Sequence, residues 1–392
     1  MGPDLLAASG VLAVLAAHPF TTYPASLFLA ARGRAAREAP WPPQGMTPSA
    51  APGPEARVAL CVSAYNEEHA IRARIENMLA LRATLPQLEL LVYVDAASDR
   101  TAEIAGEYQD RVTVVVGTAR HGKTHGMNTL VSLTEAEFVV FSDANVRFAP
   151  DAIPRLLARF ADPAVGCVCG HLIYTSEAAS ATAETGSIYW RLEERIKDLE
   201  SRTGSTMGAD GSIFAIRRRL HRPPPPDIID DMFVSMSILC DGWRVVRAAD
   251  ALAYEATVSR PGEEFRRKTR IACQAFNVHR LLWPRLRRLS LWNRYKYASH
   301  KLLRWLSGWL LAGAALCYAA GLAAMGDWIL LALSAAAGAG VLALGLARPA
   351  SAAGKLLDIA GAFAATSLGV LRSLRGDRFQ VWTPPASARA RG

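Results

Sequence analysis

The sequence predicts an α/β fold with a parallel, doubly wound sheet, joined to membrane-spanning helices at both ends of the chain. Short apolar runs alternate with helical patterns from Arg57 onward, at the spacing of strand–helix–strand units. Apolar segments long enough to cross a membrane lie near both ends of the 392 residues. Ligands of such sheets bind beyond the carboxyl ends of the strands, so the polar residues there are the candidates for function.

The individual elements follow from hydrophobic periodicity. Strands are expected at residues 58–63, 88–94, 112–116 and 138–141, and helices at 71–81, 101–108 and 123–133. Each predicted strand is short and apolar, as expected of a strand that is buried on both faces.

The first apolar stretch covers residues 5–31 and is interrupted by prolines. About 20 helical residues cross a hydrocarbon core, so the stretch is long enough to span. A cleaved signal peptide is the alternative interpretation. No Lys or Arg precedes the run and three Arg follow it, which places the following chain in the cytosol. We therefore expect a transmembrane anchor over 1–37, a Pro-, Ala- and Gly-rich linker over 38–56 and a cytosolic domain over 57–278.

The C-terminal third contains further apolar segments. Runs at 301–325 and 327–347 are separated by Gly326-Asp327 and predict a transmembrane hairpin over 301–347. The preceding segment, 279–300, mixes Trp and Tyr with Arg and Lys, which is typical of the membrane interface. Residues 348–392 hold a weaker apolar run and a basic tail. For that run a third span, a re-entrant helix and an interfacial helix all remain open.

The net charge of +9 is concentrated in basic clusters beside the apolar segments. This arrangement is typical of the cytosolic membrane face, and no nucleic-acid-recognition pattern accompanies it, so nucleic acid is not an expected partner. The six cysteines show no zinc-type pairing, and Cys167 and Cys169 alternate along one predicted strand. Reduced, packed thiols are therefore expected.

Two polar segments follow the first two predicted strands. Ala64, Asn66 and Glu67 lie in a turn that opens a helix, where backbone N–H groups are free to bind a nucleotide. Asp95 follows the second strand, where its carboxylate is able to accept hydrogen bonds from a base or ribose. Taken singly, each segment is also explained as a loop that caps the next helix.

Two more segments follow along the chain. Arg120 and Lys123 flank a Gly that lets the backbone approach a charged group, and Asn128 lies further along the same predicted helix. The spacing does not fit a Walker loop. Asp143 and Asn145 follow the strand at 138–141 and point the same way in an extended segment, so both face a hard cation that bridges phosphate oxygens. A plain strand-end turn is the alternative.

These four segments resemble, in order, the donor-site motifs of inverting family-2 glycosyltransferases with the GT-A fold, a Rossmann-like mixed sheet flanked by helices. The likeness continues through Gly208–Arg217, which resembles the acceptor-side loop, and Asp230-Asp231-Met232, which resembles the catalytic segment. Residues 266–270 resemble the basic helix and 299–305 the membrane entry of polysaccharide-synthase-like members. The resemblance covers roughly residues 57–310.

The resemblance implies roles for the catalytic residues. Asp231 would be the base and Asp230 the neighbouring acid, and two adjacent carboxylates tend to raise one pKa toward neutrality. The alternative is an exposed helix start with acidic residues at its positive end. Gly208 and Asp210 would contact the acceptor, with Asp210 as a rival base.

The resemblance also implies the donor contacts. Asp95 would hold the nucleoside, Arg120 and Lys123 would approach the donor, and Asp143 would bind Mg²⁺ or Mn²⁺. Asn145 departs from the family's Asp-x-Asp pattern, which weakens cation binding by removing one charge.

The chain also departs from the Gln-x-x-Arg-Trp motif of processive synthases. Arg267 occupies the Gln place and Ile271 the Trp place, so that only Arg270 is left to grip the diphosphate.

The implied activity is transfer of a sugar, with inversion, from a UDP- or GDP-sugar to a cell-surface glycan, exopolysaccharide or lipid-linked acceptor at the cytosolic membrane face. The expected partners are donor, acceptor, membrane lipid and polysaccharide-export proteins. The alternatives are a polyprenyl-phosphate sugar transferase and a non-catalytic partner of a synthase that binds nucleotide-sugar. High Ala, Arg and Gly usage indicates a bacterium, with the chain crossing the inner membrane several times.

Overall fold

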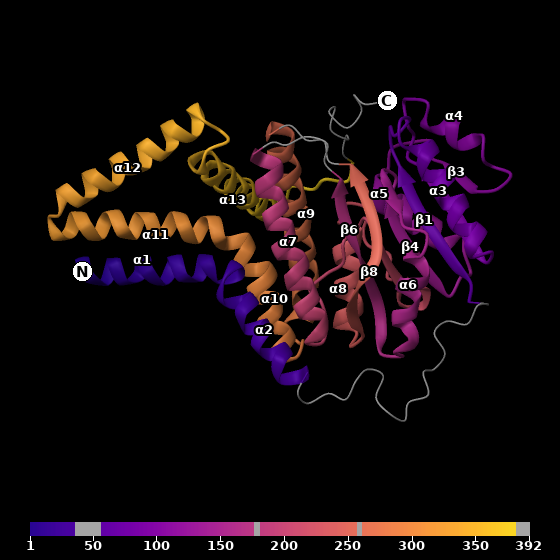
Figure 1. Cartoon of the computed structure of the whole chain (residues 1–392), viewed down its shortest axis with the longest axis horizontal. Coiled ribbons are helices and arrows are strands. Elements are labelled where there is room, and N and C mark those ends of the chain that lie inside the picture. The colour runs from indigo at the N-terminus through magenta and orange to yellow at the C-terminus, as the bar shows by residue number, and fades with distance from the viewer. Residues whose placement is uncertain (36–55, 176–180, 257–260, 382–392) are drawn as a thin grey trace.

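The computed structural model describes residues 1–35, 56–175, 181–256 and 261–381. A sheet domain flanked by helices forms one half of the molecule, and long helices from both ends of the chain project from its side (Figure 1). The predicted linker at 38–56 and the basic tail beyond residue 381 lie almost wholly outside the described residues.

Among the described residues the sheet has eight strands in the order β3-β2-β1-β4-β7-β6-β8-β5. The strands β3, β2, β1 and β4 are parallel, as predicted, whereas β7 runs antiparallel to β4 and β6, which makes the whole sheet mixed. Their bounds are β1 Val58–Ala64, β2 Leu88–Val94, β3 Thr113–Val116, β4 Phe138–Asp143, β5 Val146–Phe148, β6 Val165–Thr175, β7 Phe214–Arg217 and β8 Arg244–Ala256.

Two apolar cores cover the two faces of this sheet. Along β1, Leu60 and Val62 enter one core while Ala59 and Cys61 enter the other, because successive side chains of a strand point to opposite faces. The covering helices are α3 Ile71–Thr84, α4 Thr101–Gly106, α5 Lys123–Ser132, α6 Ala152–Ala158, α7 Ala181–Arg202, α8 Asp230–Cys240 and α9 Pro261–Leu286. All six cysteines are free thiols, as predicted.

The N-terminal apolar stretch forms two helices where the sequence predicted one crossing. Helix α1 (Gly2–Ala17) ends at a 3₁₀ turn over His18–Phe20, and α2 (Thr22–Ala35) leaves in a new direction (Figure 1). Pro19 removes a backbone donor and breaks the helix there. Tyr23 and Leu27 of α2 then pack on α7, so this second half of the stretch belongs to the domain.

The two C-terminal apolar runs form a pair of helices. Helices α11 (Leu303–Met325) and α12 (Trp328–Ala347) are joined at Gly326, whose φ of 72° ends α11 in the left-handed conformation. Asp327 caps α12 by accepting a hydrogen bond from the Leu330 N–H at 3.1 Å.

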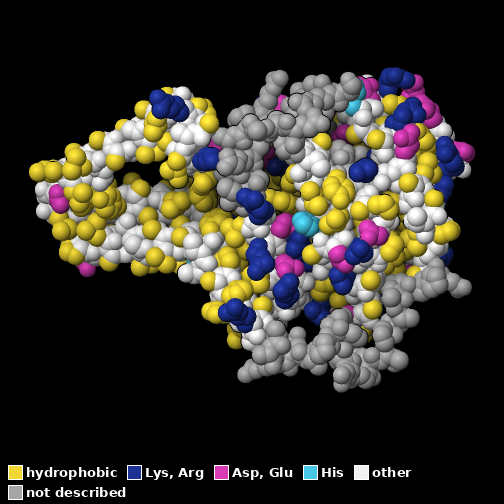
Figure 2. Space-filling view, in the orientation of Figure 1, with side chains coloured by type: hydrophobic (Ala, Val, Ile, Leu, Met, Phe, Trp, Pro, Cys, Tyr) yellow, Lys and Arg dark blue, Asp and Glu magenta, His cyan; other side chains and the backbone are white. Residues whose placement is uncertain are grey.

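Within the described residues, four helices are long and apolar enough to cross a membrane. Figure 2 shows hydrophobic side chains covering the projecting helices, while charged side chains gather on the sheet domain. The four segments are Gly2–Phe20, Leu291–Met325, Trp328–Ala347 and Ala352–Leu374.

The third apolar segment is the helix α13 (Ala352–Leu374), which packs against α9 through Gly369. A Cβ there would lie 2.5 Å from the Thr269 carbonyl oxygen and 2.6 Å from the Ala272 Cβ, so only Gly permits this approach.

The predicted boundary between residues 278 and 279 falls inside α9. The predicted interfacial segment, 279–300, continues through α10 (Leu291–Tyr297) into a π-helical turn, Ala298–Leu302. Lys296 and Tyr297 are buried within the chain, so this segment is partly core.

Candidate active site

The turns after β1 and β2 are locked together by hydrogen bonds. The Asn66 side-chain oxygen accepts from the Ser98 N–H at 2.8 Å, and the Glu67 N–H donates to the Thr101 hydroxyl at 2.8 Å. The Ala64 carbonyl accepts from the Asp95 N–H at 2.9 Å, which continues the strand pairing to the sheet edge. Asn66 and Glu67 thus hold two loops in place, beyond the cap that the sequence predicted.

Asp95 lies buried at the end of β2 and contacts the third of the four polar segments, residues 120–123, which we call the third motif. Its carboxylate accepts from the backbone N–H groups of His121 and Gly122 at 2.8 and 2.9 Å. The Arg120 guanidinium lies 3.8 Å from the same carboxylate and stacks 3.4 Å above the Tyr65 ring. Arg120 is thus held between Asp95 and the Tyr65 ring at the sheet edge.

Four charged residues from three segments meet in front of β4. The Lys123 ammonium lies 2.6 Å from Asp143 Oδ1 and 3.7 Å from Asp230 Oδ2. A Cβ on Gly211 would lie 3.0 Å from Asp231 Oδ2 and 3.1 Å from the Lys123 ammonium, so the loop passes directly over this group. We call Lys123, Asp143, Asp230 and Asp231 the carboxylate cluster.

Burial and the neighbouring Asp230 raise the pKa of Asp231 to about 7, against the lowering effect of Lys123. Burial lowers the pKa of Lys123, but Asp143 and the two aspartates of α8 raise it by more, so the ammonium stays charged. Asp231 is therefore a carboxyl group that is able to exchange a proton near neutral pH.

Asp143 and Asn145 contact different partners. Asp143 pairs with Lys123, whereas the Asn145 amide donates to Glu255 at 3.0 Å. Burial, and then the charge of Asp143, raise the pKa of Glu255 to about 7. A divalent cation would relieve the repulsion between the Asp143 and Glu255 carboxylates, and carboxylate oxygens are ligands that such an ion prefers. The described residues hold no group of three His, Cys, Asp or Glu that is spaced to bind a metal.

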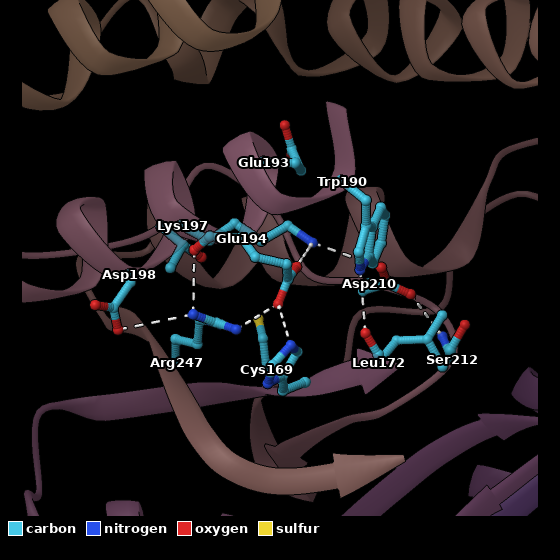
Figure 3. A network of polar contacts seen from close by, with 12 residues as sticks. Cys169, Leu172, Trp190, Glu193, Glu194, Lys197, Asp198, Asp210, Ser212 and Arg247 are labelled. Atoms are coloured by element: carbon cyan, nitrogen blue, oxygen red, sulfur yellow. Dashed lines mark hydrogen bonds and ion pairs between the residues drawn. The ribbon is translucent and has the colours of Figure 1, made fainter. Parts of the chain in front are cut away.

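Asp210 takes part in a network of charged side chains with Lys197, Glu194 and Arg247 (Figure 3). Its carboxylate lies 3.5 Å from the Lys197 ammonium, which also binds Glu194 at 3.1 Å, and Glu194 pairs with Arg247 of β8. Burial raises the pKa of Asp210, but the charge of Lys197 and hydrogen bonds from Ser212 outweigh burial and hold the pKa below its usual range. An acid with a lowered pKa is a poorer proton acceptor than Asp231.

The other predicted site residues, Asn128, Arg267 and Arg270, lie on α5 and α9 and differ in the partners that they contact. The Asn128 amide donates to the Pro224 carbonyl at 2.9 Å and so ties α5 to a neighbouring loop. Arg267 pairs with Glu264 at 2.8 Å, one turn earlier on α9. Burial, and then Arg267, lower the pKa of Arg270 to about 10, while Asp143 and Asp231 counteract this effect. Arg270 is therefore the α9 cation that faces the carboxylate cluster.

The structure also places at the site a segment that the sequence analysis did not select. Residues 377–380, after α13, lie against the third motif: the Gln380 amide donates to the His121 carbonyl at 3.1 Å, and Arg378 pairs with Asp227. Gln274 of α9 donates to the Phe379 carbonyl at 2.7 Å. The segment carries no motif, so only the fold reveals it.

The closeness of this segment to Gly122 gives a testable prediction. Gly122 has a φ of 88°, and a Cβ there would lie 2.1 Å from the Gln380 carbonyl oxygen. Gly242 has a φ of 90° with no atom within 4 Å of such a Cβ, so it is a matched control. We expect Gly242→Ala to cost roughly 1–2 kcal/mol of stability from the left-handed backbone alone.

Gly122→Ala is expected to lower the melting temperature of the detergent-solubilised chain further than Gly242→Ala, because it also displaces residues 377–380. Ending the chain at Gly376 removes the clashing carbonyl, so Gly122→Ala in that shortened chain should cost no more than Gly242→Ala. Equal effects of the two substitutions in the full chain would show that the segment does not pack there.

The sheet order, the loops at the strand ends and the carboxylate cluster define an α/β protein of the GT-A class. The family comparison agrees: residues 59–222 match the model of the Glycosyl transferase family 2. This stretch of the chain is similar to a family 2 glycosyltransferase domain.

Curated relatives match at low identity. The O-antigen chain rhamnosyltransferase WbaN of Salmonella anatum is 25% identical over 189 residues, which cover 46% of this chain and 60% of that protein. An N-acetylglucosaminyltransferase of Rhizobium leguminosarum bv. viciae is 23% identical over 248 residues, or 59% of this chain and 58% of that one. The chain thus spans about 60% of the length of these relatives.

Among solved structures, a mannosyltransferase from Pyrobaculum calidifontis in complex with GDP-Man and Mn²⁺ superposes with a TM-score of 0.69 at 23% identity. The match covers 95% of this chain and 99% of that one, so it extends beyond the sheet domain to the projecting helices. It establishes the fold that the sequence predicted.

Proposed function

We propose that this chain transfers a sugar, with inversion, from a UDP- or GDP-sugar to the hydroxyl group of a glycan or lipid-linked acceptor at the cytosolic face of a bacterial inner membrane. The carboxylate cluster is the observation that carries the proposal. It places a carboxyl group with a pKa of about 7 beside a buried cation, at the sheet edge where nucleotides bind in this fold.

In the proposed reaction the acceptor oxygen bonds to the anomeric carbon while the bond from that carbon to the diphosphate oxygen breaks. The hydroxyl proton passes to the Asp231 carboxylate, and the nucleoside diphosphate leaves with the electron pair. Asp230 keeps the pKa of Asp231 high enough for this transfer. Lys123 and Arg270 bring positive charge to the side where negative charge builds up.

A divalent cation, Mg²⁺ or Mn²⁺, would be held by Asp143 with the oxygens of Asn145 and Glu255, and when bound it neutralises charge on the diphosphate. The mannosyltransferase of the same fold was solved with Mn²⁺. Because Lys123 already binds Asp143 at 2.6 Å, the chain also has a cation of its own at this position.

Four apolar helices support a membrane location for the acceptor site. The anchor, the hairpin and α13 would hold the domain of residues 57–278 at the bilayer surface, with Asn66, Asp95 and Arg120 on the donor side and Gly208 on the acceptor side. Membrane lipid and polysaccharide-export proteins are the proposed partners.

A donor screen tests the proposal. Purified chain in detergent is incubated with UDP- and GDP-sugars and a membrane extract as acceptor, with Mn²⁺ or with EDTA, and nucleoside diphosphate release is measured. We expect one donor to react and EDTA to slow it by about tenfold or more, the effect of losing one charge-stabilising group.

The product mass then decides the acceptor class, because a single sugar on a lipid phosphate would favour a polyprenyl-phosphate sugar transferase over glycan extension. Normal donor binding without turnover on any acceptor extract would leave a non-catalytic binding protein and contradict the proposal.

A further inference from the structure

Two buried glutamates of α7 face the start of α11, and direct contacts occupy both carboxylates. Glu193 lies 3.1 Å from His300 Nε2 and also pairs with Arg304. Glu200 lies 2.8 Å from His300 Nδ1 and accepts from the Met207 N–H at 3.0 Å. These carboxylates thus contact His300, Arg304, the Tyr23 hydroxyl and the backbone.

Lys301 adds a further positive charge to this group. No residue that the structure describes forms a hydrogen bond or ion pair with its ammonium, although Glu193 and Glu200 are near. The side chain is partly buried, and a Cβ on Gly208 would lie 3.8 Å from its Cε and 4.0 Å from its ammonium. An unpaired cation inside a protein favours binding of an anion.

The loop from Gly208 to Gly211 connects this cation with the catalytic carboxyl. Its first glycine lies beside Lys301, and its last lies beside Asp231, with 3.0 Å between a Cβ there and Asp231 Oδ2. Three residues of chain span at most about 10 Å, so Gly208 beside Lys301 and Gly211 beside Asp231 lie no further apart than this.

An apolar groove begins two helical turns beyond Lys301. It lies between α11 and α13, has a volume of about 480 Å³ and is lined by residues that include Gly308, Ala312, Leu356, Ile359 and Phe363. Gly308 of α11 follows Lys301, in the π-helical turn before that helix, by seven residues, or about 10 Å along the axis.

Aromatic contacts link the two features. The Arg304 guanidinium lies 5.3 Å from the centre of the Phe20 ring, and Phe20 meets Phe363 of the groove wall at 5.8 Å. Phe20 thus lies between Arg304 of the charged group and Phe363 of the groove wall.

We propose that the acceptor is a sugar joined through a phosphate or diphosphate to a hydrocarbon chain: its anionic group binds Lys301, its chain lies in the groove between α11 and α13, and its hydroxyl faces Asp231. This inference rests on the proposed function, because it identifies the acceptor of that same site. The positive charge of Lys301 favours an anionic lipid over a neutral one. A base at Asp231 requires an acceptor with a hydroxyl group that loses its proton.

Ligand binding tests the inference without turnover. The full chain in detergent is titrated with geranylgeranyl phosphate, geranylgeraniol and inorganic phosphate, and binding is followed by native mass spectrometry. We expect the lipid phosphate to bind at least about tenfold more tightly than the alcohol, as a charge-assisted contact provides. Inorganic phosphate should compete weakly, because it cannot fill the groove.

Four variants locate the site. Lys301→Gln should remove the preference for the phosphate, and Lys301→Arg should keep it. Ala312→Trp, inside the groove, should weaken both lipids, whereas Ala336→Trp on the exposed side of α12 should change neither.

Equal binding of phosphate and alcohol would mean that the groove holds bulk lipid only, and equal competition by inorganic phosphate would mean a site for free phosphate; either result overturns the inference. The proposed function is judged separately. If wild type discriminates between the lipids but releases no nucleoside diphosphate with any donor, the proposed function fails and this binding site stands.

Discussion

Asp231→Asn is expected to lower kcat for nucleoside diphosphate release by about a thousandfold, within the range that general-base catalysis contributes. The amide has nearly the same shape as the carboxyl group but cannot accept the acceptor's proton. The Met232 N–H, which donates to Asp231 at 2.5 Å, retains an oxygen partner in the variant, so the start of α8 should stay folded.

Wild type should show a kcat/KM that rises about tenfold per pH unit below a midpoint near 7 and then levels off, because only the ionised carboxylate accepts a proton and its pKa is about 7. Asp110→Asn is a matched control: that side chain is exposed and, within the part of the chain that the structure describes, pairs with the adjacent Arg111. Its rate should equal that of wild type. If Asp231→Asn retains more than about a tenth of the activity, another group is the base.

Lys123→Gln is the substitution with the second largest expected effect. The ammonium is the direct partner of Asp143 and lies near Asp230, so its loss leaves the carboxylate cluster without its central cation. Because Lys123 lowers the pKa of Asp231, removing it raises that pKa further. We expect the midpoint of the pH profile to move up by about one unit, the usual effect of an adjacent opposite charge.

The activity of Lys123→Gln at pH 7 should fall by about a hundredfold, from a smaller ionised fraction of Asp231 and from weaker stabilisation of the leaving diphosphate. Lys123→Arg keeps the charge and should keep the midpoint. Measurement of kcat/KM between pH 5.5 and 9 shows whether the midpoint moves in each variant. A lower rate with an unchanged midpoint would show that Lys123 acts on the donor alone and does not tune Asp231.

The grouping of charged residues at the sheet edge was predictable where it depends on local sequence. Asp95, Asp143 and Lys123 follow strands whose hydrophobic runs are unmistakable, and parallel strands bring their carboxyl ends to one edge. Asn128 shows the limit of this reasoning. It lies on the predicted helix, but its amide is used by the Pro224 carbonyl, a partner 96 positions away that no local pattern indicates.

The apolar helices also combine features that local sequence indicates with contacts that it does not. Length and composition identify an apolar helix, so α11 and α12 were predicted with their turn at Gly326. Composition does not show which neighbour a helix meets. The second half of the N-terminal stretch turns at Pro19 and packs on α7, and α13 docks on α9 through Gly369.

The sequence by itself determined the fold class, the order of the strand-end motifs and the identity of the charged residues, because these depend on periodicity and on residue chemistry along the chain. Only the tertiary structure decided which charges meet. It placed Lys123 between Asp143 and Asp230, turned Asn145 to Glu255, and left Lys301 unpaired among the described residues. Such pairings depend on contacts between distant segments, and burial then sets the pKa of each group.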